Sequence, residues 1–252
     1  MNLKLNELLG LIDLTRLGDD EHEQSISALC LSAASRFGTV AAVCIYPKFV
    51  AQAAMLLRNT PVKVATVANF PKGEDSLETV LSVIQKAITD GASEVDVVFP
   101  YRLFLSGEKT AAFDFIRACK QTCGDTVLLK VILETGILAD PKVIAEVSSG
   151  LCIAGADFLK TSTGKAQVGA TKEAVKVMLD VIKQMTEELN RSIGIKVSGG
   201  IQTIDQASQY YKLAIQVMGN DWVNAKHFRI GASLLVDAIV SALLSMPLSG
   251  QH

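Results

Sequence analysis

Two hydrophobic patterns alternate along this chain. Short β-branched runs are typical of buried strands, and longer stretches with apolar residues at three- and four-residue spacing are typical of amphipathic helices. The helical pattern is clearest at Ser76–Thr89, Thr171–Leu189 and Thr203–Met218, and we expect a short N-terminal helix at about residues 3–10. The first pattern predicts eight strands, at Leu11–Thr15, Val40–Tyr46, Lys63–Phe70, Glu94–Pro100, Val127–Glu134, Asp157–Thr161, Ile193–Ser198 and Phe228–Ala232.

The order of these elements predicts the fold. Two junctions, at Gly91 and Gly155, have a helical pattern that ends in glycine and is followed at once by a strand. Strands that alternate with helices favour βαβ units and a parallel sheet. Eight such units in 252 residues match a closed (β/α)8 barrel, which we expect to form one domain over residues 1–252. An open doubly wound sheet is the alternative, but the glycine-rich dinucleotide motif after the first strand is missing.

Strand alternation predicts which side chains point into the barrel. In the fourth strand Val95, Val97 and Phe99 suit the face beneath the helices, which leaves Glu94 and Asp96 on the barrel axis. The same rule places further residues inside: Asp13, Thr15, Ala42, Cys44, Val98, Lys130, Glu134, Phe158, Lys160, Ser162, Lys196 and Ser198.

Lysines and carboxylates are unusual in a barrel interior, because a buried charge must be paired or neutralised. Such a cluster favours a functional site, and a structural ion-pair network is the alternative. Two neighbouring lysines are expected to lower each other's pKa, which makes an amine nucleophilic near neutral pH. Lys160, Lys196 and Asp96 therefore suit imine chemistry, in which Asp96 moves protons directly or through a water.

Small residues follow each of the last three predicted strands, and each of these loops leads toward a helix. Helix N-termini bind anions, and phosphate sites in such barrels gather after strands seven and eight. We therefore expect a phosphate group to be bound by Thr163, Gly164, Lys165, Gly199, Gly200, Gly231 and Ser233.

Composition excludes several other classes of protein. The net charge of -2 with no basic stripe argues against nucleic-acid binding. The five cysteines are scattered without a Cys-x-x-Cys pair and the three histidines are isolated, so no metal site is expected. The sequence has neither an apolar signal peptide nor a stretch long enough to span a bilayer. We expect a cytoplasmic protein without a membrane partner.

Four segments in the same order, Ala41–Pro47, Glu94–Tyr101, Phe158–Lys165 and Lys196–Gly200, closely resemble the deoxyribose-phosphate aldolase family. The resemblance covers nearly the whole chain. It implies that Lys160 forms the Schiff base, Lys196 is the second lysine and Asp96 transfers protons.

The same resemblance implies that Cys44 lines the pocket and that the small-residue loops hold a 5-phosphate. From their inward positions alone, we expect Asp13, Thr15, Lys130 and Glu134 to surround the catalytic residues, with Lys130 and Glu134 either pairing with each other or holding Lys196. The resemblance further implies cleavage of 2-deoxy-D-ribose 5-phosphate to acetaldehyde and D-glyceraldehyde 3-phosphate without a cofactor or metal, by a homodimer or homotetramer.

Three positions depart from the family pattern. Gln202 stands where many members have arginine, and Leu234 stands where a second serine is common. Both changes remove potential phosphate donors, so weaker phosphate affinity is expected. The chain also ends Ser-Gly-Gln-His, without the C-terminal tyrosine that some members use in proton transfer.

Two other functions compete with this prediction. One is another phosphate-binding barrel enzyme, either an isomerase or a different Schiff-base aldolase; a second lysine facing the first argues against the isomerase. The other is a barrel without catalysis that serves as a binding or regulatory protein. The intact set of Lys160, Lys196 and Asp96 argues against that alternative.

Overall fold

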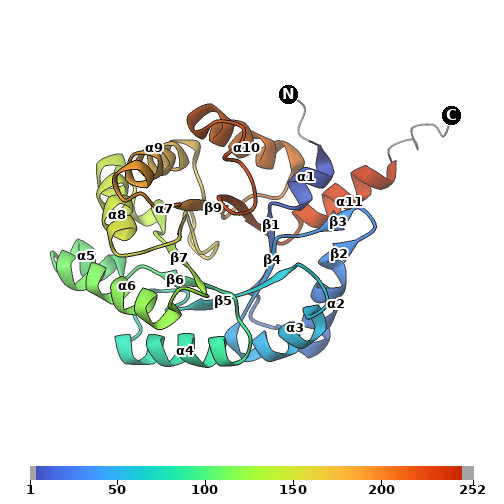
Figure 1. Cartoon of the computed structure of the whole chain (residues 1–252), viewed down its shortest axis with the longest axis horizontal. Helices are drawn as coiled ribbons and strands as arrows, with labels where there is room; N and C mark the ends of the chain where they lie inside the picture. The colour runs from blue at the N-terminus through green and yellow to red at the C-terminus, as the bar shows by residue number, and fades with distance from the viewer. Residues whose placement is uncertain (1–3, 246–252) are drawn as a thin grey trace.

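The computed structural model describes residues 4–245 and confirms the closed barrel. Its strands are all parallel, and they follow the order β1-β10-β9-β8-β7-β6-β5-β4 before β4 pairs with β1 to close the ring. Figure 1 shows the helices arranged around the outside of these strands. The barrel strands are β1 (Ile12–Arg16), β4 (Ala42–Ile45), β5 (Lys63–Ala68), β6 (Glu94–Val98), β7 (Leu128–Ile132), β8 (Phe158–Lys160), β9 (Gly194–Ser198) and β10 (Phe228–Ala232).

The helices follow the predicted alternation, and the three with the clearest sequence pattern agree with their predicted bounds to within one residue at each end. The first helix, α1, lies within the segment predicted at about residues 3–10. The helices are α1 (Leu5–Leu9), α2 (Glu23–Ser32), α3 (Val50–Leu57, after a 3-10 turn at Pro47–Phe49), α4 (Leu77–Thr89), α5 (Tyr101–Leu105), α6 (Lys109–Cys123), α7 (Thr135–Leu138), α8 (Pro141–Ile153), α9 (Lys172–Glu188), α10 (Ile204–Met218) and α11 (Leu235–Ser245).

Local sequence explains where these helices begin and end. Ser76, Thr171 and Thr203 each accept a hydrogen bond from a backbone N–H in the first turn of α4, α9 and α10, which satisfies a donor that the helix leaves free. Gly91 and Gly155 both have φ +102°, the conformation that lets the chain turn from a helix into the next strand. The helix–glycine–strand junctions predicted from the sequence are confirmed.

Two features of the fold have no counterpart in the predicted elements. A small antiparallel hairpin, β2 (Ala34–Ser35) and β3 (Gly38–Thr39), connects α2 to the second barrel strand. Its strands are too short to carry a hydrophobic period. The short helices α5 and α7 lie in the loops after β6 and β7.

The core has two parts. The larger part lies between the strands and the helices and includes Val95, Val97 and Phe99, as strand alternation predicts. A smaller apolar cluster inside the barrel consists of Leu17, Ala42, Cys44, Ala65 and Val67. The β4 and β5 side of the interior is therefore apolar, and the opposite side holds the charged residues.

The ends of the chain lie outside the described residues, so the departure at the C-terminal Ser-Gly-Gln-His and the full extent of the predicted domain have no structural counterpart here. Within residues 4–245, no helix is long and apolar enough to cross a membrane.

Candidate active site

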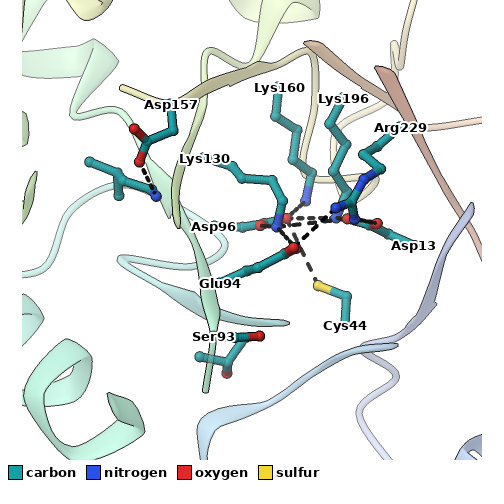
Figure 2. Close-up of polar contacts among 12 residues, drawn as sticks. Asp13, Cys44, Ser93, Glu94, Asp96, Lys130, Asp157, Lys160, Lys196 and Arg229 are labelled. Carbon is teal, nitrogen blue, oxygen red and sulfur yellow. Dashed lines mark hydrogen bonds and ion pairs between the residues drawn. The ribbon is translucent and has the colours of Figure 1, made fainter. Parts of the chain in front are cut away.

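Three lysines converge on one carboxylate inside the barrel. Asp96 on β6 accepts hydrogen bonds of 2.8 Å from the Nζ atoms of Lys130 on β7, Lys160 on β8 and Lys196 on β9. Lys130 contacts Oδ1, and the other two lysines share Oδ2. Figure 2 shows their side chains meeting at this point. β7, β8 and β9 follow β6 in order around the barrel, each paired with the one before it, and alternation turns these side chains inward. Their meeting therefore follows from the barrel register.

Two further carboxylates complete the cluster. Asp13 on β1 lies 2.7 Å from Lys196 Nζ and 2.7 Å from Nη1 of Arg229 on β10. Glu94 on β6 lies 2.7 Å from Lys130 Nζ and 3.1 Å from Nη2 of Arg229. All of these side chains are buried, and Lys160, with 2% of its surface exposed, is the one that also reaches a cavity.

Arg229 is a part of the cluster that the sequence reasoning missed. The alternation rule could have found it, because Phe228 and Ile230 pack in the core outside the barrel and so leave Arg229 and Gly231 facing inward. Glu94 was predicted to face the axis, but it was not assigned to the site.

Lys160 and Lys196, which share the Oδ2 atom of Asp96, have opposite pKa shifts. Burial lowers the pKa of Lys160, and the Lys196 ammonium lowers it further, against the opposing effect of Asp96. Burial also disfavours the charged form of Lys196, but the carboxylates of Asp13 and Asp96 hold its pKa well above the ordinary value. The expectation that each lysine lowers the other's pKa therefore holds for Lys160, and it is wrong as a net effect for Lys196.

Asp96 and Asp13 stay ionised. Burial alone would raise the pKa of Asp96, but Lys130, Lys160 and Lys196 hold it well below the usual range. The same balance of burial against Lys196, Arg229 and Lys130 lowers the pKa of Asp13. At neutral pH Lys196 is thus a cation paired with the Asp13 and Asp96 carboxylates. Lys160 is the amine of the cluster that gives up its proton most readily.

A cavity of about 660 Å³ opens at the carboxyl ends of the strands, with Lys160 in its wall. This is the end of the barrel at which enzymes of this architecture hold their substrates. Thr15 and all the residues predicted to bind phosphate contribute to the lining, namely Thr163, Gly164, Lys165, Gly199, Gly200, Gly231 and Ser233.

Cys44 departs from its predicted place in the pocket wall. Its side chain is fully buried within the apolar cluster on the β4 side and does not line the cavity. The sulfur lies 3.9 Å from Asp96 Oδ2, and burial raises the pKa of the thiol. Cys44 therefore packs beneath the charged cluster as a neutral side chain.

Lys130 and Glu134 do not pair with each other, although the sequence allowed that interpretation. Lys130 binds Asp96 and Glu94, as described above. Glu134 has φ +57°, and its carboxylate accepts hydrogen bonds from the Thr163 hydroxyl and, at 3.3 Å, from the Thr163 backbone N–H. Burial raises the pKa of Glu134. The residue fixes the loop after β8, at the mouth of the cavity.

The absence of a side chain at Gly231 leaves room for the Lys196 side chain. A Cβ atom at this position would stand 3.0 Å from Lys196 Cε and 2.9 Å from Ser198 Cβ, closer than side chains normally pack. Gly231 therefore contributes to the charged cluster as well as to the cavity wall.

The expected helix N-termini are less open to an anion than the sequence suggests. Thr171 and Thr203 already cap α9 and α10, and the Gln206 side chain accepts from the backbone N–H of Gln202 at 2.8 Å. By contrast, α11 begins at Leu235, directly after Ser233 and Leu234 in the cavity lining. The backbone N–H groups at the start of α11 are thus better placed to bind an anion in the cavity than those of α9 and α10.

Charges of both signs surround this end of the cavity. Arg16 and Lys165 line it, but Arg16 Nε lies 3.0 Å from Glu21 Oε2, and Glu21 and Asp237 are lining residues too. Gln202 and Leu234 also line it, so the two departures from the family pattern fall in the cavity itself. Among residues 4–245, no group of three or more His, Cys, Asp or Glu side chains is arranged to hold a metal ion.

Comparison with known families matches residues 9–233 to the DeoC/LacD family of aldolases. The chain belongs to this family. The match spans every barrel strand and the cavity lining as far as Ser233.

Solved structures agree with this family. A provisionally assigned deoxyribose-phosphate aldolase from Coccidioides immitis is 30% identical, with a TM-score of 0.83 over 96% of this chain and 87% of the other. A similarly assigned protein from Toxoplasma gondii, in its apo form, is 26% identical, with a TM-score of 0.84 over 97% of both chains. The tetrameric deoxyribose phosphate aldolase of Aeropyrum pernix is 26% identical, with a TM-score of 0.78 over 96% and 93% of the two chains.

Proposed function

We propose that this aldolase cleaves 2-deoxy-D-ribose 5-phosphate reversibly to acetaldehyde and D-glyceraldehyde 3-phosphate through a Schiff base on Lys160. The observation that carries the proposal is the position of Lys160: a buried lysine in the wall of the cavity whose one carboxylate partner, Asp96, is shared with two other lysines. Burial and Lys196 favour its neutral form, which is the nucleophilic form of an amine.

In the first half of the reaction the Lys160 amine adds to the C1 aldehyde to form a carbinolamine. The carbinolamine loses water and becomes a protonated imine, which draws electrons toward the nitrogen. The Nζ atoms of Lys160 and Lys196 each lie 2.8 Å from Asp96 Oδ2, so Asp96 and Lys196 are the proposed base and acid for these proton transfers.

In the second half, removal of the C3 hydroxyl proton forms the aldehyde of glyceraldehyde 3-phosphate. The electron pair of the C2–C3 bond moves into the imine and leaves an enamine on Lys160. Protonation of the enamine at C2 gives the imine of acetaldehyde, and water releases acetaldehyde and the free amine. Asp96, directly or through a water, is the proposed base for the hydroxyl proton.

The cavity beside Lys160 supports the phosphorylated class of substrate. Its small-residue loops let a phosphate approach the backbone, and the start of α11 together with Lys165 offers donors and positive charge. We assign the 5-phosphate to this end, near Gly200, Gly231 and Ser233. Gln202, Leu234 and Asp237 in the same wall make the predicted phosphate affinity weaker than in relatives with an arginine there.

By analogy with the tetrameric relative, the proposal extends to a homo-oligomer, a dimer or tetramer. A role in deoxyribonucleotide breakdown in the cytoplasm follows from the proposed substrate.

A direct assay tests this function. The purified chain, treated with a chelator, is incubated with 2-deoxy-D-ribose 5-phosphate, and acetaldehyde and glyceraldehyde 3-phosphate are measured separately. We expect equal amounts of both products, and none from Lys160→Leu. An isomerase would consume the substrate without releasing acetaldehyde, and a non-catalytic barrel would leave it intact; either result rejects the proposal.

A further inference from the structure

The charged cluster contains unequal numbers of the two signs. Ion pairs join three carboxylates, Asp13, Glu94 and Asp96, to four cationic side chains, Lys130, Lys160, Lys196 and Arg229. The nearby Glu134 carboxylate is outside these ion pairs: it is bound by Thr163, and burial raises its pKa. If every group were ionised, the buried cluster would carry one surplus positive charge, which is costly away from water. One of the four cationic groups is therefore favoured to be neutral.

The contacts indicate which group that is. Lys130 and Lys196 each lie within 2.8 Å of two carboxylates, and Arg229 lies within 3.1 Å of two. Lys160 has an ion pair only with Asp96 among residues 4–245, and it shares that oxygen with Lys196. An arginine keeps its charge under all ordinary conditions, so the proton that is easiest to lose is that of Lys160.

We infer that Arg229 is a positioning residue which keeps Lys160 in its neutral, nucleophilic form by occupying the Asp13 and Glu94 carboxylates with a permanent charge. The inference rests on the proposed function, in which Lys160 forms the Schiff base. Arg229 acts through the cluster, because neither it nor its partners Asp13 and Glu94 line the cavity. Its guanidinium also lies over the Phe158 ring, 5.7 Å from the ring centre, which fixes it beneath the lysines.

Each barrel strand around Lys160 places either a charged side chain or an uncharged one in the barrel interior. Asp96, Lys196, Cys44 and Glu134 act on Lys160 directly. Asp13, Glu94, Lys130 and Arg229 act on it through those partners, while β5 offers only the apolar Ala65 and Val67. Removal of the Arg229 charge would leave three carboxylates for three lysines, and the balance would then permit Lys160 to keep its proton.

The test is the pH dependence of imine formation in charge variants. The initial rate of adduct formation with acetaldehyde, trapped by cyanoborohydride and quantified by mass spectrometry, is measured across pH. The proteins compared are wild type, Arg229→Gln, Arg229→Lys, Glu94→Gln and the double variant Glu94→Gln/Arg229→Gln. Arg58→Gln, at an exposed position, is the matched control for loss of an arginine. Circular dichroism and thermal unfolding show whether each variant is folded.

We expect the profile of Arg229→Gln to move to higher pH by about one unit, which is roughly a tenfold lower rate at a fixed pH below the midpoint. Glu94→Gln removes a carboxylate and is expected to move the profile the opposite way. The double variant Glu94→Gln/Arg229→Gln, and Arg229→Lys, return it toward wild type, and Arg58→Gln leaves it in place.

Opposite shifts in the two single variants support the inference, and either one suffices if the other fails to fold. Folded variants that lose rate equally at all pH values would overturn it, because Arg229 would then be structural only. A wild type without any Lys160 adduct is a different result, since it would reject the proposed function itself.

Discussion

Asp96 is the residue on which the site depends most directly. Its two buried oxygens accept hydrogen bonds from three lysine amino groups, and its removal would leave those groups without their common partner. A buried ion cluster of this kind contributes little net stability when complete, but it is strongly destabilising when one member is removed.

We therefore predict that Asp96→Asn, which keeps the shape and removes the charge, costs about 3–5 kcal/mol in the free energy of unfolding. Turnover should fall by a factor of about 10²–10⁴, because the variant loses its general base. Urea unfolding and steady-state cleavage measure the two effects. Asp205→Asn, at an exposed position in the first turn of α10, is the control. An Asp96→Asn variant with wild-type turnover would exclude the proposed role of this carboxylate.

At this scale the sequence predicted the interior cluster through strand alternation alone. That rule places Lys160, Lys196 and Asp96 on one side of the barrel wall, and the structure brings them into contact. It could not predict that Glu134 holds Thr163, because that contact depends on a backbone turn with φ +57° at Glu134. Nor could it say which carboxylate each lysine meets, since this depends on side-chain length across the barrel.

At the level of elements, β10 and the loop after it support the site through the absence of a side chain at Gly231. Gly231→Ala would bring a methyl group against Lys196 Cε and Ser198 Cβ. We predict a destabilisation of about 1–3 kcal/mol and a larger loss of activity, because Lys196 is displaced from Asp96.

Gly10→Ala is the matched control for this substitution. At Gly10 the backbone has φ −66°, and an added Cβ would have only ordinary contacts, at 3.5 Å and beyond. Thermal unfolding and cleavage assays compare the two variants. Equal effects would show that Gly231 has no special relation to Lys196.

In the proposed function, the loop between β9 and α10 contributes to the binding of the substrate phosphate. Gln202 lies in the cavity wall and has no charge to offer. We predict that Gln202→Arg lowers the KM for 2-deoxy-D-ribose 5-phosphate about tenfold, the size of one charge-assisted hydrogen bond, while kcat/KM for unphosphorylated deoxyribose stays the same. An unchanged KM, or an equal gain for both sugars, would place the phosphate elsewhere.

Element positions were predicted well where the hydrophobic period was long. The first residues of α4, α9 and α10 follow from the N-cap residues Ser76, Thr171 and Thr203, which can be recognised in the sequence. The capping threonines also explain why the helix N-termini of α9 and α10 are less open to an anion than predicted. The sequence suggested free N–H groups there, but side chains already accept hydrogen bonds from them. The hairpin of β2 and β3 has strands of two residues each, too short to predict.

For the whole molecule, the neutral state of Lys160 connects catalysis to stability. Its pKa is lowered in the folded protein, so between that value and about 10.4 the unfolded chain binds a proton that the folded chain does not. The contribution of Lys160 to the free energy of unfolding then rises with pH across this window, by up to about 1.4 kcal/mol per pH unit.

Lys160→Leu removes that contribution and leaves the rest of the cluster in place. We predict that the difference in free energy of unfolding between wild type and Lys160→Leu grows with pH in favour of wild type over this window. Denaturant unfolding at a series of pH values measures it. Parallel curves would mean that Lys160 keeps its proton, contrary to its proposed role as a nucleophile.

The barrel as a whole places one reactive amine at the base of one cavity, and trapping tests this claim most directly. The full chain is incubated with acetaldehyde and borohydride, and the modified residue is located by peptide mass mapping. The account predicts one stable ethyl group on Lys160 and none on Lys196, whose proton is held by Asp13 and Asp96. An unmodified chain under conditions in which it cleaves substrate, or an adduct on Lys196 instead, would contradict it.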